Sequence, residues 1–267
     1  MTVENGVGLV GRGGVSLSFL ARIPALLARL GPIKAYSYRV ACQISNSLRA
    51  GYAVSHYSAL AACPAIWIWT PEPLLDRTLL ELKAKAAMNG TMVVLCDSIR
   101  DSGSVERLPG ARVATLNPIP DSNERVFVAE GHPETLRMLR QLLAESGRKL
   151  IGLKPGGKPL YFAGVHAASS LLLPWIGAAV DGLRASGFSY AEAARVCEFL
   201  GARALRQYAK TGSNAWNRAA GESLRRALEH DLPAIRSQNR ELADLYEQGI
   251  RIALARFELS ATSAAVK

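Results

Sequence analysis

A short glycine-rich stretch near the N-terminus constrains the fold of this chain more than any other feature. The apolar run VGLVG (residues 7–11) predicts a buried strand, and SLSFLARIPALLARLG (residues 16–31) has the apolar spacing of a helix. Between them, Gly11 and Gly13 are followed at the next key position by Ser16. Small residues at this spacing allow a strand to turn directly into a closely packed helix.

Further strand and helix patterns alternate up to residue 155. Such alternation predicts a mainly parallel sheet whose strands are joined by crossover helices. Helices are expected over YRVACQISNSLRAGY, 74–90 and 132–147, and strands over 33–38, 65–71, 91–98, 111–120, 125–131 and 149–155.

The pattern changes after Pro155-Gly156-Gly157, where no convincing strand follows. Residues 159–187 read as one long helix that Pro174 kinks, and 190–212, 221–230 and 233–258 read as further helices. We therefore predict two domains, an α/β domain over 1–155 and an all-helical domain over 156–267.

The glycine turn has the composition of a dinucleotide-binding turn. Gly11 permits the turn, Gly13 allows a pyrophosphate to approach the backbone, and Gly14 and Ser16 stay small enough for close packing. The helix that follows offers free N–H groups to phosphate oxygens, and Arg12 lies within the turn. The alternative is a tight strand–helix turn that binds nothing.

The end of the second predicted strand indicates which dinucleotide would bind. An acidic residue at this point accepts a hydrogen bond from the ribose 2′-hydroxyl of NAD, but this chain has Tyr36, Ser37, Tyr38 and Arg39 there. Ser37 and Arg39 can bind a 2′-phosphate, so NADP is the predicted cofactor. In the alternative interpretation, Arg39 is an ordinary solvated surface residue.

Composition narrows the class of ligand and the compartment. The net charge of +10 comes from 32 basic and 22 acidic residues spread along the chain, which favours small anionic ligands over a nucleic-acid groove. The four cysteines are isolated, which favours a reducing cytoplasm and argues against a zinc or other metal site. The apolar stretches break too early for a predicted membrane span, and no signal peptide is expected.

The order of several segments resembles a known family. After the glycine turn come AIWIWTPEPLLD, VVLCDS, TLNPIP, KPLYFAGVHAASS and a Thr-Gly segment with a later arginine. From residue 7 to about 255 the chain resembles Rossmann-like oxidoreductases with a helical C-terminal domain of unknown function, which are allied to pyrroline-5-carboxylate reductase, ketopantoate reductase and deazaflavin-dependent NADP reductases. The resemblance implies a Rossmann-type doubly wound parallel sheet followed by an all-helical domain similar to the C-terminal domain of 6-phosphogluconate dehydrogenase.

The family pattern carries over unevenly. Thr70 and Pro71 match the strand end where the family backbone passes the cofactor. Cys96-Asp97-Ser98 stands where the family often has His-Cys-Ser-Gly, and Asn117-Pro118 where it often has His-Pro. Ser169-Ser170 stands where it often has Ser-Asn. Tyr161-Phe162-Ala163 stands where it often has Tyr-His-Ala. Histidines and an asparagine of the family are thus replaced, so the resemblance implies a retained scaffold with an altered cleft.

Three residues at the predicted domain junction are candidates for catalysis. Lys158, Tyr161 and His166 could each donate a proton to a carbonyl or imine substrate. Lys158 could equally be an exposed cation at the helix start, Tyr161 a packing aromatic and His166 a partly buried helix residue.

Six polar residues are candidates for substrate binding. Asp97 and Ser98 follow a strand on the side of the sheet where ligands bind, and Arg218 could hold a substrate carboxylate with its guanidinium. The segment TGSNAWNR could instead be a capped turn between helices. The full set is Asp97, Ser98, Asn117, Ser170, Asn214 and Arg218.

Two functions are compatible with these patterns. The first is an NADP-dependent reductase of a small carbonyl or imine compound, which could be anionic, and the second is a catalytically degenerate dinucleotide-binding protein that acts as a sensor or partner subunit. We expect a homodimer formed through the C-terminal helices, since the segment 165–180 is too apolar for a solvated face.

Overall fold

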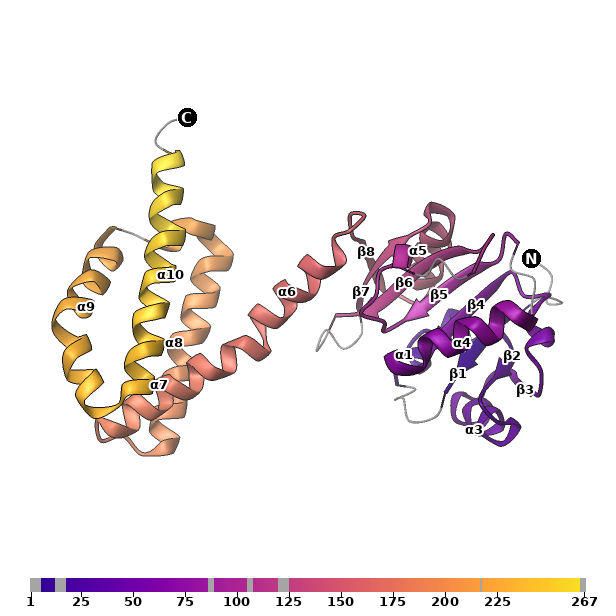
Figure 1. Ribbon diagram of the computed structural model, residues 1–267, viewed down its shortest axis with the longest axis horizontal. Helices are drawn as coiled ribbons and strands as arrows, with labels where there is room; N and C mark the ends of the chain where they lie inside the picture. The colour runs from indigo at the N-terminus through magenta and orange to yellow at the C-terminus, as the bar shows by residue number, and fades with distance from the viewer. Residues whose placement is uncertain are drawn as a thin grey trace. The chain divides into compact units, whose positions relative to one another are not determined.

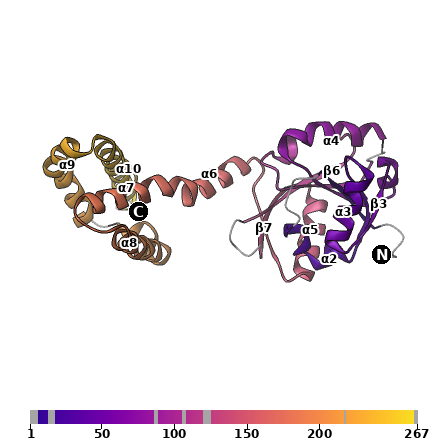
Figure 2. The same cartoon turned by 90° about the horizontal axis from the view of Figure 1, so that it is seen from below.

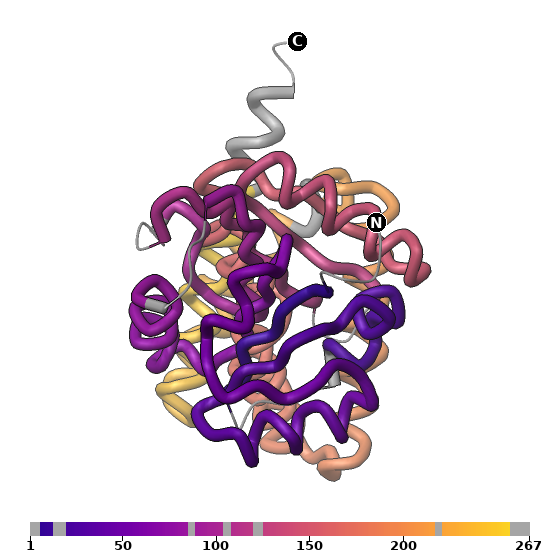
Figure 3. The backbone as a smooth tube through the Cα atoms, turned by 90° about the vertical axis from the view of Figure 1, so that its right-hand side faces the viewer, coloured from indigo at the N-terminus to yellow at the C-terminus, as the bar shows by residue number. Residues whose placement is uncertain are grey.

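The computed structural model describes residues 6–12, 18–85, 89–104, 108–119, 125–216 and 218–264. It divides into two compact units, Met1–Gly164 and Val165–Lys267, each of which is described by itself. The chain can be followed from the indigo strands of the first unit to the orange and yellow helices of the second (Figure 3).

The first unit contains one eight-stranded sheet in the order β3-β2-β1-β4-β5-β6-β7-β8 (Figure 1). Every neighbouring pair is parallel except β6 and β7. The strands are β1 (Val7–Gly11), β2 (Leu30–Lys34), β3 (Tyr52–Val54), β4 (Ala65–Trp69), β5 (Met92–Cys96), β6 (Arg112–Pro118), β7 (Val126–Gly131) and β8 (Lys149–Gly152).

Helices cover both faces of the sheet, as Figure 2 shows for α4 on one face and α3 and α5 on the other. The helices of this unit are α1 (Ser18–Ala21), α2 (Pro24–Leu27), α3 (Tyr38–Leu48), η1 (Tyr57–Leu60), α4 (Glu72–Lys85), η2 (Ser102–Ser104) and α5 (Pro133–Glu145). One core cluster joins the sheet to α1, α2, α3 and α5, and the other joins it to η1 and α4. The predicted doubly wound α/β arrangement is therefore confirmed.

The second unit is helical throughout the residues that the structure describes. Its elements are η3 (Ser170–Leu172), α7 (Leu173–Ala185), α8 (Tyr190–Thr211), η4 (Gly212–Ala215), α9 (Arg218–Gln238) and α10 (Arg240–Ala264), and α6 (Lys158–Ala168) leads into it from the first unit. The last strand ends at Gly152, so no described strand follows the glycine pair at 156–157.

Prolines explain several differences from the predicted elements. The helix expected over 16–31 is divided, because Pro24 disfavours helical backbone at Ile23 and begins the separate helix α2. The long helix expected over 159–187 is likewise interrupted by η3, and Pro174 lies in the first turn of α7. In contrast, α9 continues through Pro233 and ends before Asn239, whose Oδ1 accepts from the Leu242 N–H at 3.0 Å.

Two strands also differ from expectation. β2 begins at Leu30, so Gly31 and Pro32 lie inside it rather than at a helix stop. A Cβ on Gly6 would come within 2.9 Å of the Gly31 Cα, so glycine allows the backbones before β1 and inside β2 to approach closely. β3 was not predicted: the expected helix YRVACQISNSLRAGY includes only its first residue, Tyr52, and a strand of three residues is too short for a clear alternating pattern.

The helical unit has little core of its own. Most large apolar side chains of α7 and α8 are exposed, including Leu173, Ile176, Phe199 and Leu205, and its buried apolar residues among those described are Val180, Ala193, Leu232, Ala243 and Ile250. By length and composition alone, Lys158–Ala185 could cross a membrane, since an 18-residue window within it has a mean hydropathy of 1.4 and is 6% buried. From the sequence we expected no stretch to pass this test of length and composition, and the core helix of a soluble protein passes it as well.

Candidate active site at the carboxyl ends of the strands

The parallel strands bring most of the predicted site residues to one edge of the sheet. From β1 the chain continues to β2 and β3 on one side of the sheet, whereas from β4 it continues to β5 and β6 on the other side. The point between β1 and β4 is therefore the switch point at which α/β proteins bind ligands. At this edge the glycine turn follows β1, Thr70 and Pro71 follow β4, and Asp97 and Ser98 follow β5. Asn117 lies near the end of the neighbouring strand β6.

The beginning of the glycine turn packs closely against α3. A Cβ on Gly11 would come within 2.8 Å of the Ile44 side chain, so a small residue is needed there. The predicted cofactor residues Gly13, Gly14 and Ser16 lie outside the described residues.

The Arg12 side chain is bound by residues of α4. Its Nε donates to Thr78 Oγ1 at 2.9 Å, and its guanidinium pairs with Glu81 at 3.0 Å. The Tyr57 hydroxyl also donates to Glu81, at 3.2 Å. Burial, and to a smaller extent the negative charge of Glu81, raises the pKa of Tyr57 to about 12. Arg12 is buried, and its side chain therefore anchors the turn to α4.

The segment after β2 presents polar and aromatic side chains at the N-terminus of α3. Ser37 caps this helix, since its Oγ accepts from the Val40 N–H at 3.3 Å. Tyr36, Tyr38 and Arg39 are exposed beside it. A helix N-terminus with a nearby guanidinium can attract an anion.

Thr70 has an unusual environment at the end of β4. Its Oγ1 is buried, and no hydrogen-bond partner for this atom is found among the described residues. A buried hydroxyl without a partner is unfavourable, so a ligand at this edge could satisfy it.

A polar cluster follows β5. Asp97 has a left-handed backbone with φ of 55°, and its N–H donates to the Leu116 carbonyl at 2.8 Å. Asn117 donates from Nδ2 to the Ser98 carbonyl at 3.0 Å, and Ser98 donates from Oγ to Glu72 at 3.1 Å. Partial burial raises the pKa of Asp97, whereas the Asn117 hydrogen bond and the Lys158 charge oppose that change.

Lys158 lies among these groups at the first residue of α6. It is 1% exposed, and its Nζ donates to the Arg100 carbonyl at 2.6 Å. Burial lowers its pKa to about 8, although surrounding carboxylates favour the charged form. Burial and then the negative charge of Asp97 raise the pKa of Tyr161, one turn along the helix. Lys158, Tyr161 and Asp97 thus belong to one cluster.

Several members of the cluster were missed by the sequence analysis, among them Arg100 and Glu130. Arg100 pairs with Glu72 at 2.9 Å and with Asp76 at 2.7 Å. Glu130 is buried and accepts from the Ser102 N–H and Oγ, both at 2.7 Å, and from Thr115 Oγ1 at 2.9 Å. An acid inside the apolar run RVFVAEG is the signal that could have identified Glu130.

The remaining predicted residues belong to the helical unit. His166 lies in the last turn of α6, Ser170 in η3 and Asn214 in η4, and all three are exposed. Arg218 is the first residue of α9. The cluster around Lys158 is thus complete within the first unit without these four.

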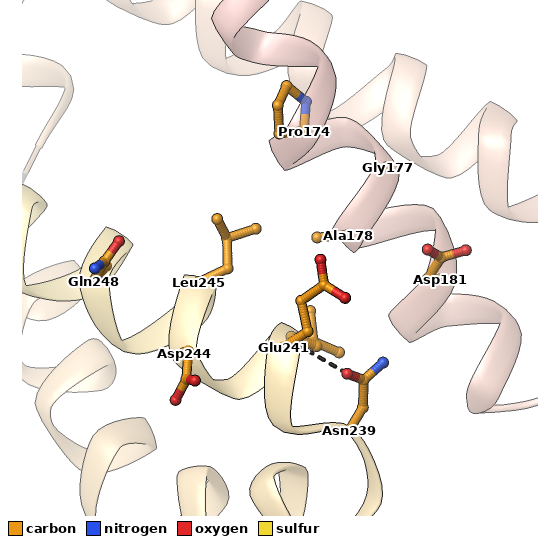
Figure 4. A pocket seen from close by; sticks show the side chains of 10 residues that line it. Pro174, Gly177, Ala178, Asp181, Asn239, Glu241, Asp244, Leu245 and Gln248 are labelled. Atoms are coloured by element: carbon orange, nitrogen blue, oxygen red, sulfur yellow. Dashed lines mark hydrogen bonds between the residues drawn. The ribbon is translucent and has the colours of Figure 1, made fainter.

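Two of the depressions within the helical unit differ in the character of their lining. One, of about 380 Å³, is lined by Pro174 and by the acidic residues Asp181, Glu241 and Asp244 (Figure 4). A larger groove of about 850 Å³ along α8 is mostly apolar and is lined by Ile176, Leu205 and Tyr208, among others. None of the predicted catalytic residues lines either depression, and no group of three or more potential metal ligands occurs among the described residues.

A Rossmann-type sheet followed by a helical unit is the fold of several solved reductases. A V8 variant of an imine reductase from Myxococcus stipitatus in complex with NAD+ matches with a TM-score of 0.66 at 16% identity, over 95% of this chain and 94% of that one. A pyrroline carboxylate reductase from Plasmodium falciparum with NADP bound gives 0.54 at 10% identity, over 96% and 100%.

A protein from Thermotoga maritima matches with a TM-score of 0.67 at 15% identity, over 96% of this chain and 99% of that one. No protein-family model matches the chain, and no curated protein matches it by sequence. The comparisons confirm the fold that the resemblance implied, over nearly the whole chain.

Proposed function

We propose that this protein is an NADP-dependent reductase of a small imine or carbonyl compound. The observation that carries the proposal is the buried Lys158 with its pKa of about 8, beside Tyr161 and Asp97 at the ligand-binding edge of the sheet. The shared fold with an imine reductase and a pyrroline carboxylate reductase supports the same chemistry.

The residues at this edge fit NADP. The unpartnered buried hydroxyl of Thr70, with Pro71 beside it, is suited to a pyrophosphate that lies close to the backbone. Ser37 and the exposed Arg39 would hold the 2′-phosphate, where an acid would repel it. When bound, the reduced cofactor supplies a hydride.

The protein then has to supply a proton. A group whose pKa lies near the working pH is an efficient donor, and the pKa of Lys158 meets this condition. Tyr161 is the second candidate donor, since its hydroxyl remains protonated at neutral pH. Both residues belong to the first turns of α6, which follows the last strand of the sheet.

One observation favours a second function, dinucleotide binding without turnover. The Lys158 Nζ is almost fully buried and already donates to the Arg100 carbonyl, so its path to a substrate is restricted. In that case the protein acts as a sensor or partner subunit, in line with the replaced family histidines.

NADPH oxidation measured with a panel of small imines and ketones separates the two functions. Lys158→Met is expected to lower turnover by about 10²–10⁴-fold while leaving the Kd for NADPH unchanged, as for loss of a proton donor. Lys149→Met, an exposed lysine in β8, is the matched control. Binding of NADPH without oxidation on any compound would favour the sensor, and absence of NADPH binding would contradict both.

The proposal includes an assembly and a compartment. Residues 1–155 would bind the cofactor, and 156–267 would contribute to substrate binding and pair with a second copy through their exposed apolar helices. Cys42, Cys63, Cys96 and Cys197 are all free, which supports a reducing cytoplasm.

A further inference from the structure

The surroundings of Lys158 are rich in negative charge. The carboxylates of Glu72, Asp97, Asp101 and Glu130 all act on its ammonium group. The other cation of the cluster, Arg100, already pairs with Glu72 and Asp76. Five carboxylates therefore face two basic side chains, and we expect this excess of negative charge to repel an anionic substrate.

Asp97 is the carboxylate of this cluster with the most open position. Its side chain is exposed, whereas Glu130 is buried and uses both oxygens for protein donors. Asp97 is also fixed at the strand end, because its left-handed backbone is tied to the Leu116 carbonyl. Aspartate adopts this backbone more readily than most residues do.

A second acceptor lies beside Asp97. Asn117 is 3% exposed, and its amide N–H groups are used by the Ser98 carbonyl and the Asp97 carboxylate. Its Oδ1 is buried without a hydrogen-bond partner among the described residues. A buried acceptor that is unsatisfied indicates a missing donor.

We infer that Asp97 determines specificity by selecting a substrate whose nitrogen is cationic, with Asn117 Oδ1 as the second acceptor for that nitrogen's N–H groups. This inference rests on the proposed reductase function and names its substrate class: a protonated imine without a carboxylate near the reacting carbon. It differs from the anionic substrate that the sequence suggested through Arg218.

Neighbouring groups support this role of Asp97. Partial burial raises the pKa of Asp97, and the Asn117 hydrogen bond and the positive charge of Lys158 oppose that shift. The ionised carboxylate forms a charge-assisted hydrogen bond with a cationic nitrogen. A neutral ketone of the same shape lacks that bond, and a carboxylate would meet the excess negative charge of the cluster.

Binding of three ring compounds of similar size to the full-length protein tests the inference independently of turnover. Calorimetry with NADP+ present would compare pyrrolidine, which is a cation at pH 7, with cyclopentanol and cyclopentanecarboxylate. We expect pyrrolidine to bind at least tenfold more tightly than either. Asp97→Asn, which keeps a residue suited to the left-handed backbone, should weaken pyrrolidine at least tenfold, whereas Glu134→Gln on α5 should not change it.

Three results would overturn the inference. They are binding of cyclopentanecarboxylate as tight as that of pyrrolidine, absence of pyrrolidine binding, and an unchanged pyrrolidine affinity in Asp97→Asn. NADPH titration of the same preparations distinguishes failure of the proposed reductase function from failure of the inference about Asp97. A protein that oxidises NADPH with anionic substrates retains the proposed function but not the inference. A protein that binds pyrrolidine through Asp97 but no dinucleotide loses the proposed function alone.

Discussion

Lys158 shows what burial of a single charge does to this protein. An ammonium group that is 1% exposed is unfavourable unless it is paired, and here one carbonyl and several carboxylates only partly replace its water. The residual penalty appears as a pKa of about 8 in place of 10.5. The same shift makes Lys158 a candidate proton donor and makes stability depend on pH.

The sign of that dependence follows from proton binding. Between pH 8 and 10.5 the unfolded chain keeps the Lys158 proton more than the folded chain does, so stability rises with pH across this window. Relative to Lys158→Met, the wild type should gain about 3 kcal/mol of unfolding free energy from pH 7.5 to 10.5. Urea unfolding of both proteins at the two pH values measures it, and a constant difference would contradict the burial of a titrating lysine.

Single residues could be predicted where chemistry and position coincide. The sequence placed Lys158 and Tyr161 at a helix start and Asp97 at the end of a strand, and the structure has them at these positions. Arg12 lies within the predicted cofactor turn, but sequence could not show that Thr78 and Glu81, more than sixty residues away, bind its guanidinium. The partners of Glu130 are likewise not its neighbours in sequence, since Ser102 lies 28 residues away and Thr115 lies 15 residues away.

At the scale of elements, the end of β7 is the most constrained point of the sheet. Gly131 has φ of 131°, and a Cβ there would come within 2.5 Å of both the Ala114 Cα and the Val113 carbonyl oxygen. Any larger residue must strain its own backbone and push β6 away, just where the antiparallel pair ends and α5 begins.

Gly131→Ala should therefore lower the free energy of unfolding by about 2 kcal/mol or more. The matched control is Gly152→Ala at the end of β8, where a Cβ would meet nothing within 4 Å. Chemical denaturation of the two variants gives the comparison. Equal stabilities would mean that β6 and β7 are not packed as closely as described.

Element type was easier to predict than element boundaries. Long apolar strands such as β4 and β5 and amphipathic helices such as α5 have clear periods, and the structure confirms them. Boundaries depended on prolines whose effect differs with context. Pro24 and Pro174 begin helices, Pro32 lies in a strand, and Pro233 is inside a helix.

At the scale of the whole molecule, we predict that a second copy of the chain covers the exposed apolar surface of the helical unit. The groove along α8 includes Leu205, which is 65% exposed, and Tyr208, which is 48% exposed. Apolar faces of this extent are usually covered in solution. In a symmetric dimer the same apolar face of each copy would be covered by the other copy.

Light scattering at micromolar concentration without detergent should give the mass of a dimer. Leu205→Glu places a charge in the apolar groove and should shift the protein toward monomer, whereas Arg203→Glu, at an exposed position outside the groove lining, should not. A wild-type monomer, or a protein that is soluble only with detergent, would contradict the dimer.

Calorimetric titration with NADPH and NADH tests the choice of NADP as cofactor most directly. The wild type should bind NADPH roughly ten- to a hundredfold more tightly, because a charge-assisted contact to the 2′-phosphate contributes about 1.5–3 kcal/mol. Arg39→Ala should remove most of this preference, whereas Arg140→Ala, an exposed arginine in α5, should retain it. Equal affinity of the wild type for both dinucleotides, or no binding of either, would contradict the account.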